Sequence, residues 1–114
     1  MYNTSVIAFL SEIKKLIASG RWQFVTRTYK LSNGSTQTYL QALFELDIDH
    51  PNDVPNEILK LTPLDYYSGP EDDRDRNNGT KLWIFKKNIN GITTYIKLKI
   101  DERGCVCVSF HKDR

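Results

Sequence analysis

The last third of the chain limits the fold most strongly. Three runs rich in β-branched and aromatic residues follow one another there: KLWIFKKNI (81–89), ITTYIKLKI (92–100) and CVCVSFH (105–111). The dipeptide Asn90–Gly91 between the first two runs is a strong signal for a two-residue hairpin turn, and DERG (101–104) marks a second turn. The sequence therefore predicts a three-stranded antiparallel meander.

Alternation assigns the residues of the middle run to two faces. Ile96, Leu98 and Ile100 lie on a core face, and Tyr95, Lys97 and Lys99 lie on the opposite face. If Asn90 and Gly91 form the loop, Lys86 lies opposite Tyr95 and Ile84 lies opposite Lys97.

The second hairpin is predicted from burial. Placing alternate apolar residues in the core selects the pairs Ile100–Val106, Leu98–Val108 and Ile96–Phe110. The polar face then carries two rows across the three strands, the first formed by Lys86, Tyr95 and His111 and the second by Ile84, Lys97 and Ser109.

The first half of the chain predicts helices. SVIAFLSEIKKLIASG (5–20) has the spacing of an amphipathic helix that starts at Thr4 or Ser5 and stops at Gly20. Residues 21–31 favour an extended segment, a second helix is expected over about 35–46, and short helices are expected near Pro55 and after Thr62. Residues 68–80 lack hydrophobic periodicity and predict a long loop. Helices followed by an antiparallel sheet predict one α+β domain over residues 1–114, with the helices on one face of the sheet.

Composition and charge narrow the functional classes. No apolar run approaches the ~18 residues that a membrane span needs, and no secretory signal is recognisable, so a cytoplasmic protein is expected. The only two cysteines, Cys105 and Cys107, are two residues apart on one strand, and we expect them to be reduced and partly buried. Residues 1–40 carry five basic side chains and one acidic side chain, and residues 81–114 carry eight basic and three acidic side chains. Residues 41–80 between them carry three basic and ten acidic side chains. This segregation predicts a basic surface for a polyanion.

The row of Lys86, Tyr95 and His111 has a definite chemical use. Cleavage of RNA by its own 2′-hydroxyl needs a base, an acid and a cation beside the phosphate, and histidine and lysine supply these groups. A structural interpretation remains open beside this one, because alternating lysines also protect exposed strands from edge pairing.

The run LTPLDYYSGPEDDR…LWIFKK…TYIKLKI…CVSFHKD, over roughly residues 57–112, resembles the MqsR (motility quorum-sensing regulator) toxin family of type II toxin–antitoxin systems. IKKLIASGRW and VTRTYK are similar to the opening of that family. The resemblance implies a RelE-like fold and a metal-independent, sequence-selective endoribonuclease. Such an enzyme needs no cofactor, cleaves mRNA and is held inactive by a cognate antitoxin protein.

The resemblance also assigns residues. The strand tyrosine of the family falls on Tyr95, the lysine two residues later on Lys97, and the terminal lysine on His111. Two positions depart from the best-known members: Ser68 replaces a lysine and Ile84 replaces a glutamine.

The sequence thus predicts a catalytic set and a substrate-binding set. The catalytic set consists of His111, Tyr95, Lys97 and Lys86, and no metal ligands are expected. The substrate-binding set consists of Lys99, Arg74, Arg76, Ser68, Ser109 and Glu71. Two alternatives stay open, a non-catalytic RNA-binding module and a protein-interaction domain, both using the same basic face.

Overall fold

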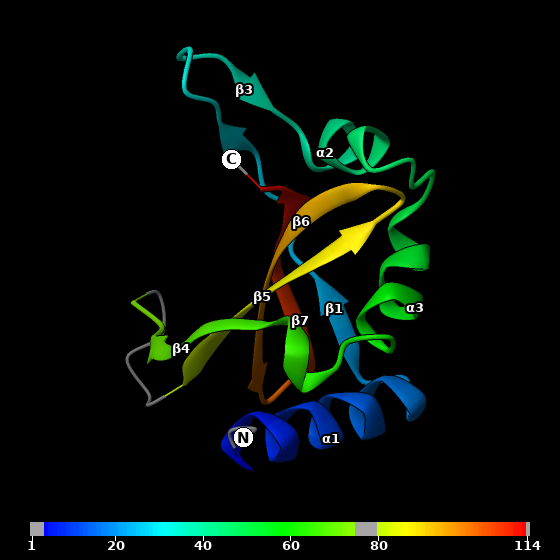
Figure 1. Cartoon of the computed structure of the whole chain (residues 1–114), viewed down its shortest axis with the longest axis vertical. Helices are drawn as coiled ribbons and strands as arrows, with labels where there is room; N and C mark the ends of the chain where they lie inside the picture. Colours follow the sequence, from blue (N-terminus) through cyan, green and yellow to red (C-terminus); the bar gives the residue numbers. More distant parts are fainter. Residues whose placement is uncertain (1–3, 75–79, 114) are drawn as a thin grey trace.

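The computed structural model describes residues 4–74 and 80–113. Its centre is a five-stranded sheet with the order β1-β7-β6-β5-β4 (Figure 1). The strands are β1 (Trp22–Phe24), β4 (Tyr66–Asp72), β5 (Lys81–Ile89), β6 (Ile92–Asp101) and β7 (Gly104–Lys112). β1 pairs with β7 in parallel, and the other neighbours are antiparallel. The α+β class and the C-terminal meander are confirmed, but each side of the meander gains a strand and the sheet is mixed.

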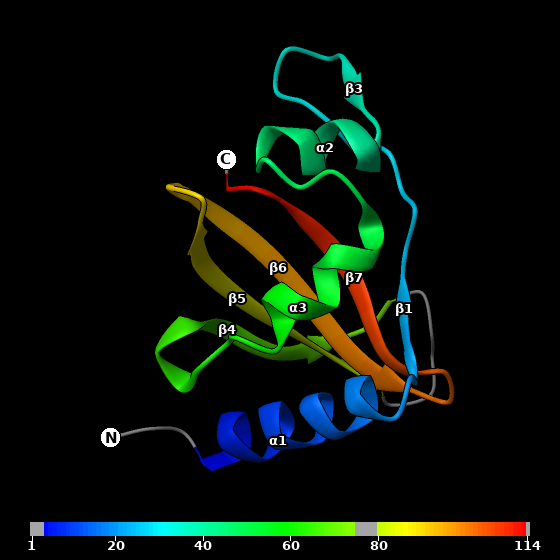
Figure 2. The same cartoon turned by 90° about the vertical axis from the view of Figure 1, so that its right-hand side faces the viewer.

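Helices cover one face of this sheet. The helical elements are α1 (Thr4–Ala18), α2 (Tyr39–Glu45), α3 (Val54–Ile58) and the 3₁₀ turns η1 (Pro51–Asp53) and η2 (Pro63–Asp65). Figure 2 shows α3 in front of the sheet and α1 across the lower end of the strands, while a separate hairpin of β2 (Tyr29–Lys30) and β3 (Thr36–Gln37) extends beyond the sheet. Among the described residues, no helix is long and apolar enough to cross a membrane.

α1 is the amphipathic helix that the spacing predicts. Its residues Val6, Phe9 and Ile13 are buried, and the ring of Phe9 stacks on Trp83 of β5 at 4.7 Å between centroids. Burying side chains of this size stabilises the fold by about 1.5–3 kcal/mol each. Gly20 ends the helix with φ of +80°, and its amide donates to the carbonyl of Ile17.

The β5–β6 hairpin has the predicted turn and register. Asn90 and Gly91 both have positive φ, 53° and 85°, as a type I′ turn requires. Lys86 pairs with Tyr95 and Ile84 with Lys97.

The β6–β7 register is correct over one half and wrong over the other. Tyr95 pairs with His111, Ile96 with Phe110 and Lys97 with Ser109, as predicted. The ladder then shifts, so that Leu98 pairs with Cys107 and Ile100 with Cys105. Val108 is therefore an extra residue in β7, and the two cysteines face the core where the valines were expected.

The segment predicted as a long loop begins as a strand. β4 runs along β5 as far as Asp72, with register irregularities on both sides of Ser68. Gly69 has φ of +108°, and a Cβ atom there would lie 2.7 Å from the carbonyl oxygen of Leu82, so this close approach requires glycine. Pairing with β5 therefore overrides the unfavourable strand propensity of this acidic, Gly- and Pro-containing segment.

The other corrections concern short elements. The helix expected over 35–46 starts later, because Thr36–Gln37 pairs with β2 and Thr38 caps the helix through the amide of Gln41. The short helix expected after Thr62 is confirmed as the single 3₁₀ turn η2, with the Thr62 amide 2.8 Å from Oδ2 of Asp65.

Candidate functional site

One row of side chains crosses β5, β6 and β7 on the face opposite the helices. The register places Lys86, Tyr95 and His111 next to one another. The rings of Tyr95 and His111 stack with centroids 5.1 Å apart and planes 13° apart. This contact brings together the predicted histidine and the predicted tyrosine.

The backbone fixes the orientation of the His111 ring. Nδ1 lies 2.8 Å from the carbonyl oxygen of Lys112, and because a carbonyl only accepts, Nδ1 carries a hydrogen. In the neutral ring, Nε2 is then the basic nitrogen, and it becomes a donor when the ring is protonated. Nε2 is therefore the atom of His111 that can take up or release a proton.

Tyr29 supports His111 from the β2–β3 hairpin. Its ring meets His111 edge-on at 4.6 Å between centroids, and its hydroxyl accepts a hydrogen bond from the amide of Phe110 at 3.2 Å. Burial raises the pKa of Tyr29, against the opposing effect of the Phe110 amide. The sequence predicts an extended segment around Tyr29, but nothing in its local pattern specifies a contact with a residue 81 positions away.

Lys86 is held between an acid and an aromatic ring. Its Nζ lies 3.1 Å from Oδ2 of Asp113 and 3.8 Å from the centroid of the Tyr67 ring. The hydrogen bond to Asp113 raises the pKa of Lys86, so this side chain acts as a cation and not as a base at neutral pH. Neither Tyr67 nor Asp113 stood out in the sequence, although Tyr67 follows directly after the core residue Tyr66.

A second row follows one step along the strands. Ser68, Ile84, Lys97 and Ser109 lie side by side across β4 to β7. Ile84 and Ser109 are buried, and Ser68 is half-buried. The Nζ atom of Lys97 lies 5.9 Å from the Tyr95 ring centroid and 3.8 Å from Oε1 of Glu71. Lys97 is therefore the cation of this row that adjoins the Tyr95–His111 pair.

A groove of about 840 Å³ extends the open face beyond Lys97. Its lining consists of Val25, Arg27, Glu71, Asp72, Asp73, Arg74, Leu82, Lys97, Lys99 and Val108. The groove includes three of the predicted substrate-binding residues, Glu71, Arg74 and Lys99. Arg76 lies outside the described residues.

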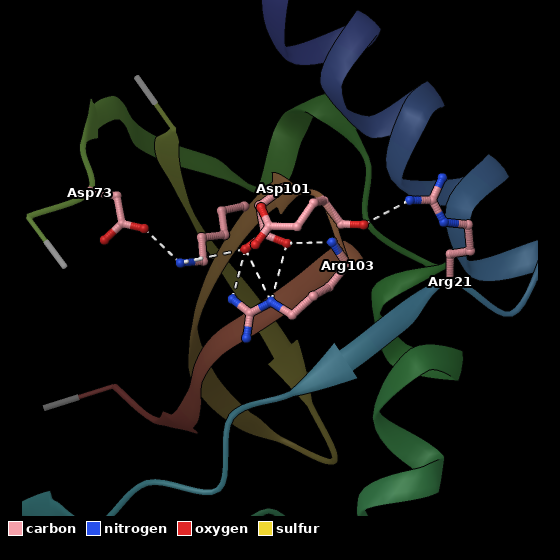
Figure 3. A network of polar contacts seen from close by, with 6 residues as sticks. Arg21, Asp73, Asp101 and Arg103 are labelled. Carbon is pink, nitrogen blue, oxygen red and sulfur yellow. Dashed lines mark hydrogen bonds and ion pairs between the residues drawn. The ribbon is translucent and has the colours of Figure 1, made fainter. Parts of the chain in front are cut away.

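Lys99 differs from its expected role on an open surface. It is only 6% exposed, and its Nζ lies 2.6 Å from Oδ2 of Asp73 and 3.9 Å from Oδ2 of Asp101. Figure 3 shows these contacts continuing from Asp101 to Arg103 in the β6–β7 turn. The hydrogen bond from the Arg103 guanidinium lowers the pKa of the Asp101 carboxyl. We call Asp73, Lys99, Asp101 and Arg103 the buried ion network; Asp73 neutralises the ammonium of Lys99.

The two cysteines are part of the core. Cys105 and Cys107 are free thiols and both are buried, more deeply than the sequence indicated. Burial raises the pKa of the Cys105 thiol to about 12. Within residues 4–74 and 80–113, no group of three or more His, Cys, Asp or Glu side chains has an arrangement that could hold a metal ion.

The sequence matches no protein-family model, and a search of curated proteins finds no match.

Proposed function

We propose that this chain is the toxin of a type II toxin–antitoxin pair and an endoribonuclease of the MqsR family. Its substrate would be mRNA in the cytoplasm, its activity would need no metal, and a cognate antitoxin protein would hold it inactive. The observation that carries this proposal is the His111 ring, which is stacked on Tyr95, oriented by the Lys112 carbonyl and placed in one row with Lys86. The sequence resemblance supports it independently.

The proposed reaction uses a nucleophile that the RNA itself provides. The 2′-oxygen attacks the adjacent phosphorus, the P–O2′ bond forms and the P–O5′ bond breaks. A base removes the 2′-hydroxyl proton, and an acid protonates the departing 5′-oxygen. The products are a 2′,3′-cyclic phosphate on one fragment and a 5′-hydroxyl on the other.

The side chains of the row suit these steps. Nε2 of His111 acts as the acid or the base, because an imidazole changes its protonation state near neutral pH. Lys97 and Lys86 stabilise the negative charge that develops on the phosphate oxygens. Tyr95 orients the phosphate or stacks on a base. Arg74 and Ser68 lie along the same face and would contribute to binding the RNA strand, while the buried Ser109 lies next to Lys97 in register and would not reach it.

Cleavage of a defined mRNA by purified full-length protein tests this proposal. We expect products with 2′,3′-cyclic phosphate and 5′-hydroxyl ends, and a loss of about 10²–10⁴-fold in rate for His111→Asn. His50→Asn is a matched control, because His50 is the other histidine of the chain and is exposed. In the wild type the Asn52 amide donates a hydrogen bond to the His50 ring at 3.0 Å. An asparagine at position 50 retains an acceptor for this hydrogen bond.

The same assay separates the alternatives. Salt-dependent RNA binding without cleavage products would indicate a non-catalytic RNA-binding module. Absence of both binding and cleavage would favour a protein-interaction domain. Equal cleavage by the wild type and His111→Asn would remove His111 from the proposed role.

A further inference from the structure

The groove beside Lys97 carries both signs of charge. Its cations come from separate parts of the sheet: Arg27 follows the edge strand β1, Lys97 and Lys99 belong to the central strand β6, and Arg74 follows the opposite edge strand β4. Its acidic side chains belong to three consecutive residues at the end of β4, Glu71, Asp72 and Asp73. The groove therefore spans the sheet between two arginines, and one acidic segment lies within it.

The three acidic residues make three different contacts. Asp73 contacts Lys99 at 2.6 Å, and both side chains are almost fully buried. Asp72 contacts Lys81, which does not line the groove, and the Asp72 side chain is 83% exposed. Glu71 contacts Lys97 at 3.8 Å and keeps 48% of its side chain exposed. Among the contacts between described residues, the one from Glu71 joins the acidic segment to a cation of the proposed catalytic set.

The Glu71–Lys97 contact is easily exchanged for another anion. Exposed ion pairs at such distances contribute little to stability, because water solvates both charges. Arg27 and Arg74 have no ion pair within the part of the chain that the structure describes, so an entering polyanion meets two cations that no carboxylate of those described residues neutralises. A phosphodiester that contacts Arg27 or Arg74 brings the neighbouring phosphates of the same strand towards Lys97.

We propose that the groove holds the backbone of the RNA nucleotides next to the cleaved bond, and that the Glu71 carboxylate occupies the position of one phosphate on Lys97 until RNA displaces it. This inference rests on the proposed endoribonuclease function and adds an internal competitor to it. Glu71 then weakens RNA binding in the wild type. The buried Asp73–Lys99 pair stays in place during the exchange and keeps the end of β4 on the sheet.

The test compares Glu71→Gln with Asp72→Asn. Both substitutions remove one negative charge from neighbouring exposed residues, but only Glu71 contacts Lys97. The ligand is a short labelled single-stranded RNA whose 2′-hydroxyls are methylated, so that it cannot be cleaved, and its binding is followed by fluorescence anisotropy. We expect Glu71→Gln to bind about three- to tenfold more tightly than wild type. Asp72→Asn should tighten binding by a clearly smaller factor, because Asp72 lines the groove but does not contact Lys97.

Salt dependence gives a second readout. In the wild type, displaced Glu71 takes up counterions again when RNA binds, which offsets part of the counterion release. The slope of log Kd against log salt is therefore expected to be steeper in Glu71→Gln, by up to about 0.7, and nearly unchanged in Asp72→Asn. Arg74→Gln should weaken binding several-fold more than Lys15→Gln, which removes an exposed cation from α1.

Failure of this inference differs from failure of the proposed function. The wild type could cleave mRNA while Glu71→Gln and Asp72→Asn have equal affinities and equal salt slopes. That result would refute the displacement of Glu71 from Lys97 by RNA, but it would leave the proposed endoribonuclease function intact. If the wild type neither binds nor cleaves RNA, both proposals fall. Tighter binding and a steeper slope in Glu71→Gln alone support the displacement.

Discussion

Lys97 and Lys99 lie two residues apart on β6 and point to the same face of the sheet, yet their surroundings differ. The Lys97 side chain is 21% exposed and contacts the half-exposed Glu71 at 3.8 Å. The Lys99 side chain is 7% exposed and contacts the buried Asp73 at 2.6 Å. One alternating strand therefore carries a cation available to a ligand and, one step further along, a cation that holds the fold together.

The end of β4 makes this difference. Its acidic residues close over the part of the open face that contains Lys99, while the Tyr95–His111 pair lies beyond its reach. Alternation determines the face of a side chain, but the covering segment determines whether that side chain can contact a ligand.

Removing Lys99 should produce the largest loss of stability. Lys99→Ala removes the cation that lies 2.6 Å from the buried Asp73 carboxylate, and we expect the free energy of unfolding to fall by about 3–5 kcal/mol. Lys97→Ala, measured by the same urea titration, should lower it by less than about 1 kcal/mol. Equal losses would contradict the distinction between the two lysines.

Removing Lys97 should affect the proposed catalysis instead. Lys97→Ala removes a cation next to the Tyr95–His111 pair, and we expect mRNA cleavage to slow by about 10²–10³-fold. The melting temperature should stay close to that of the wild type, and Lys97→Arg should retain part of the activity because it keeps the charge. Wild-type cleavage by Lys97→Ala would place the reacting phosphate elsewhere.

Acid should weaken the buried ion network from the Asp101 side. The Arg103 hydrogen bond lowers the pKa of Asp101 below its ordinary value, so the folded state prefers the carboxylate. This contribution is fully present above the ordinary aspartate pKa of about 3.9 and is lost as the pH falls through the lower native pKa.

Urea titrations from neutral to strongly acidic pH test the Asp101 prediction. Asp101→Asn should cost about 1.5–3 kcal/mol at neutral pH and should flatten the loss of stability below about pH 4. Asp49→Asn is the matched control, because Asp49 is an exposed aspartate that lies outside the buried ion network. An unchanged acid profile in Asp101→Asn would show that Arg103 does not stabilise the native carboxylate.

The smallest effect is expected on the core face of the same strands. The raised pKa values of Cys105 and Cys107 keep both thiols protonated, and both are buried. Iodoacetamide should therefore leave the native protein unlabelled at mildly alkaline pH and label both cysteines in urea. Rapid labelling of the folded protein would show that the core face opens.

Local signals predicted which residues of the candidate site lie side by side on β5 and β6, because this pairing depends on local geometry. The Asn90–Gly91 turn sets the β5–β6 register, and that register alone brings Lys86 beside Tyr95 and Ile84 beside Lys97. The β6–β7 hairpin could not be predicted in the same way. Val106 is fully buried although it faces away from the helices, so both faces are covered at that end and burial does not select one register.

Long-range contacts account for the rest. Tyr29 reaches His111 from a separate hairpin, and Asp73 reaches Lys99 across 26 positions of the chain. The parallel pairing of β1 with β7 likewise joins distant segments. A hydrophobic pattern indicates which residues of a local segment are buried. It carries no information about contacts between segments that are far apart in the sequence.

The extra residue in β7 changes the face of the sheet on which the following side chains lie. Cys105, Cys107 and His111 have the same parity along the chain, so a regular strand would present all three on one side. Because Val108 adds one step between Cys107 and Ser109, the cysteines stay inside and His111 turns to the opposite side, while Phe110 enters the core. His111 therefore faces away from the core because β7 contains one extra residue, and not because of any property of histidine itself.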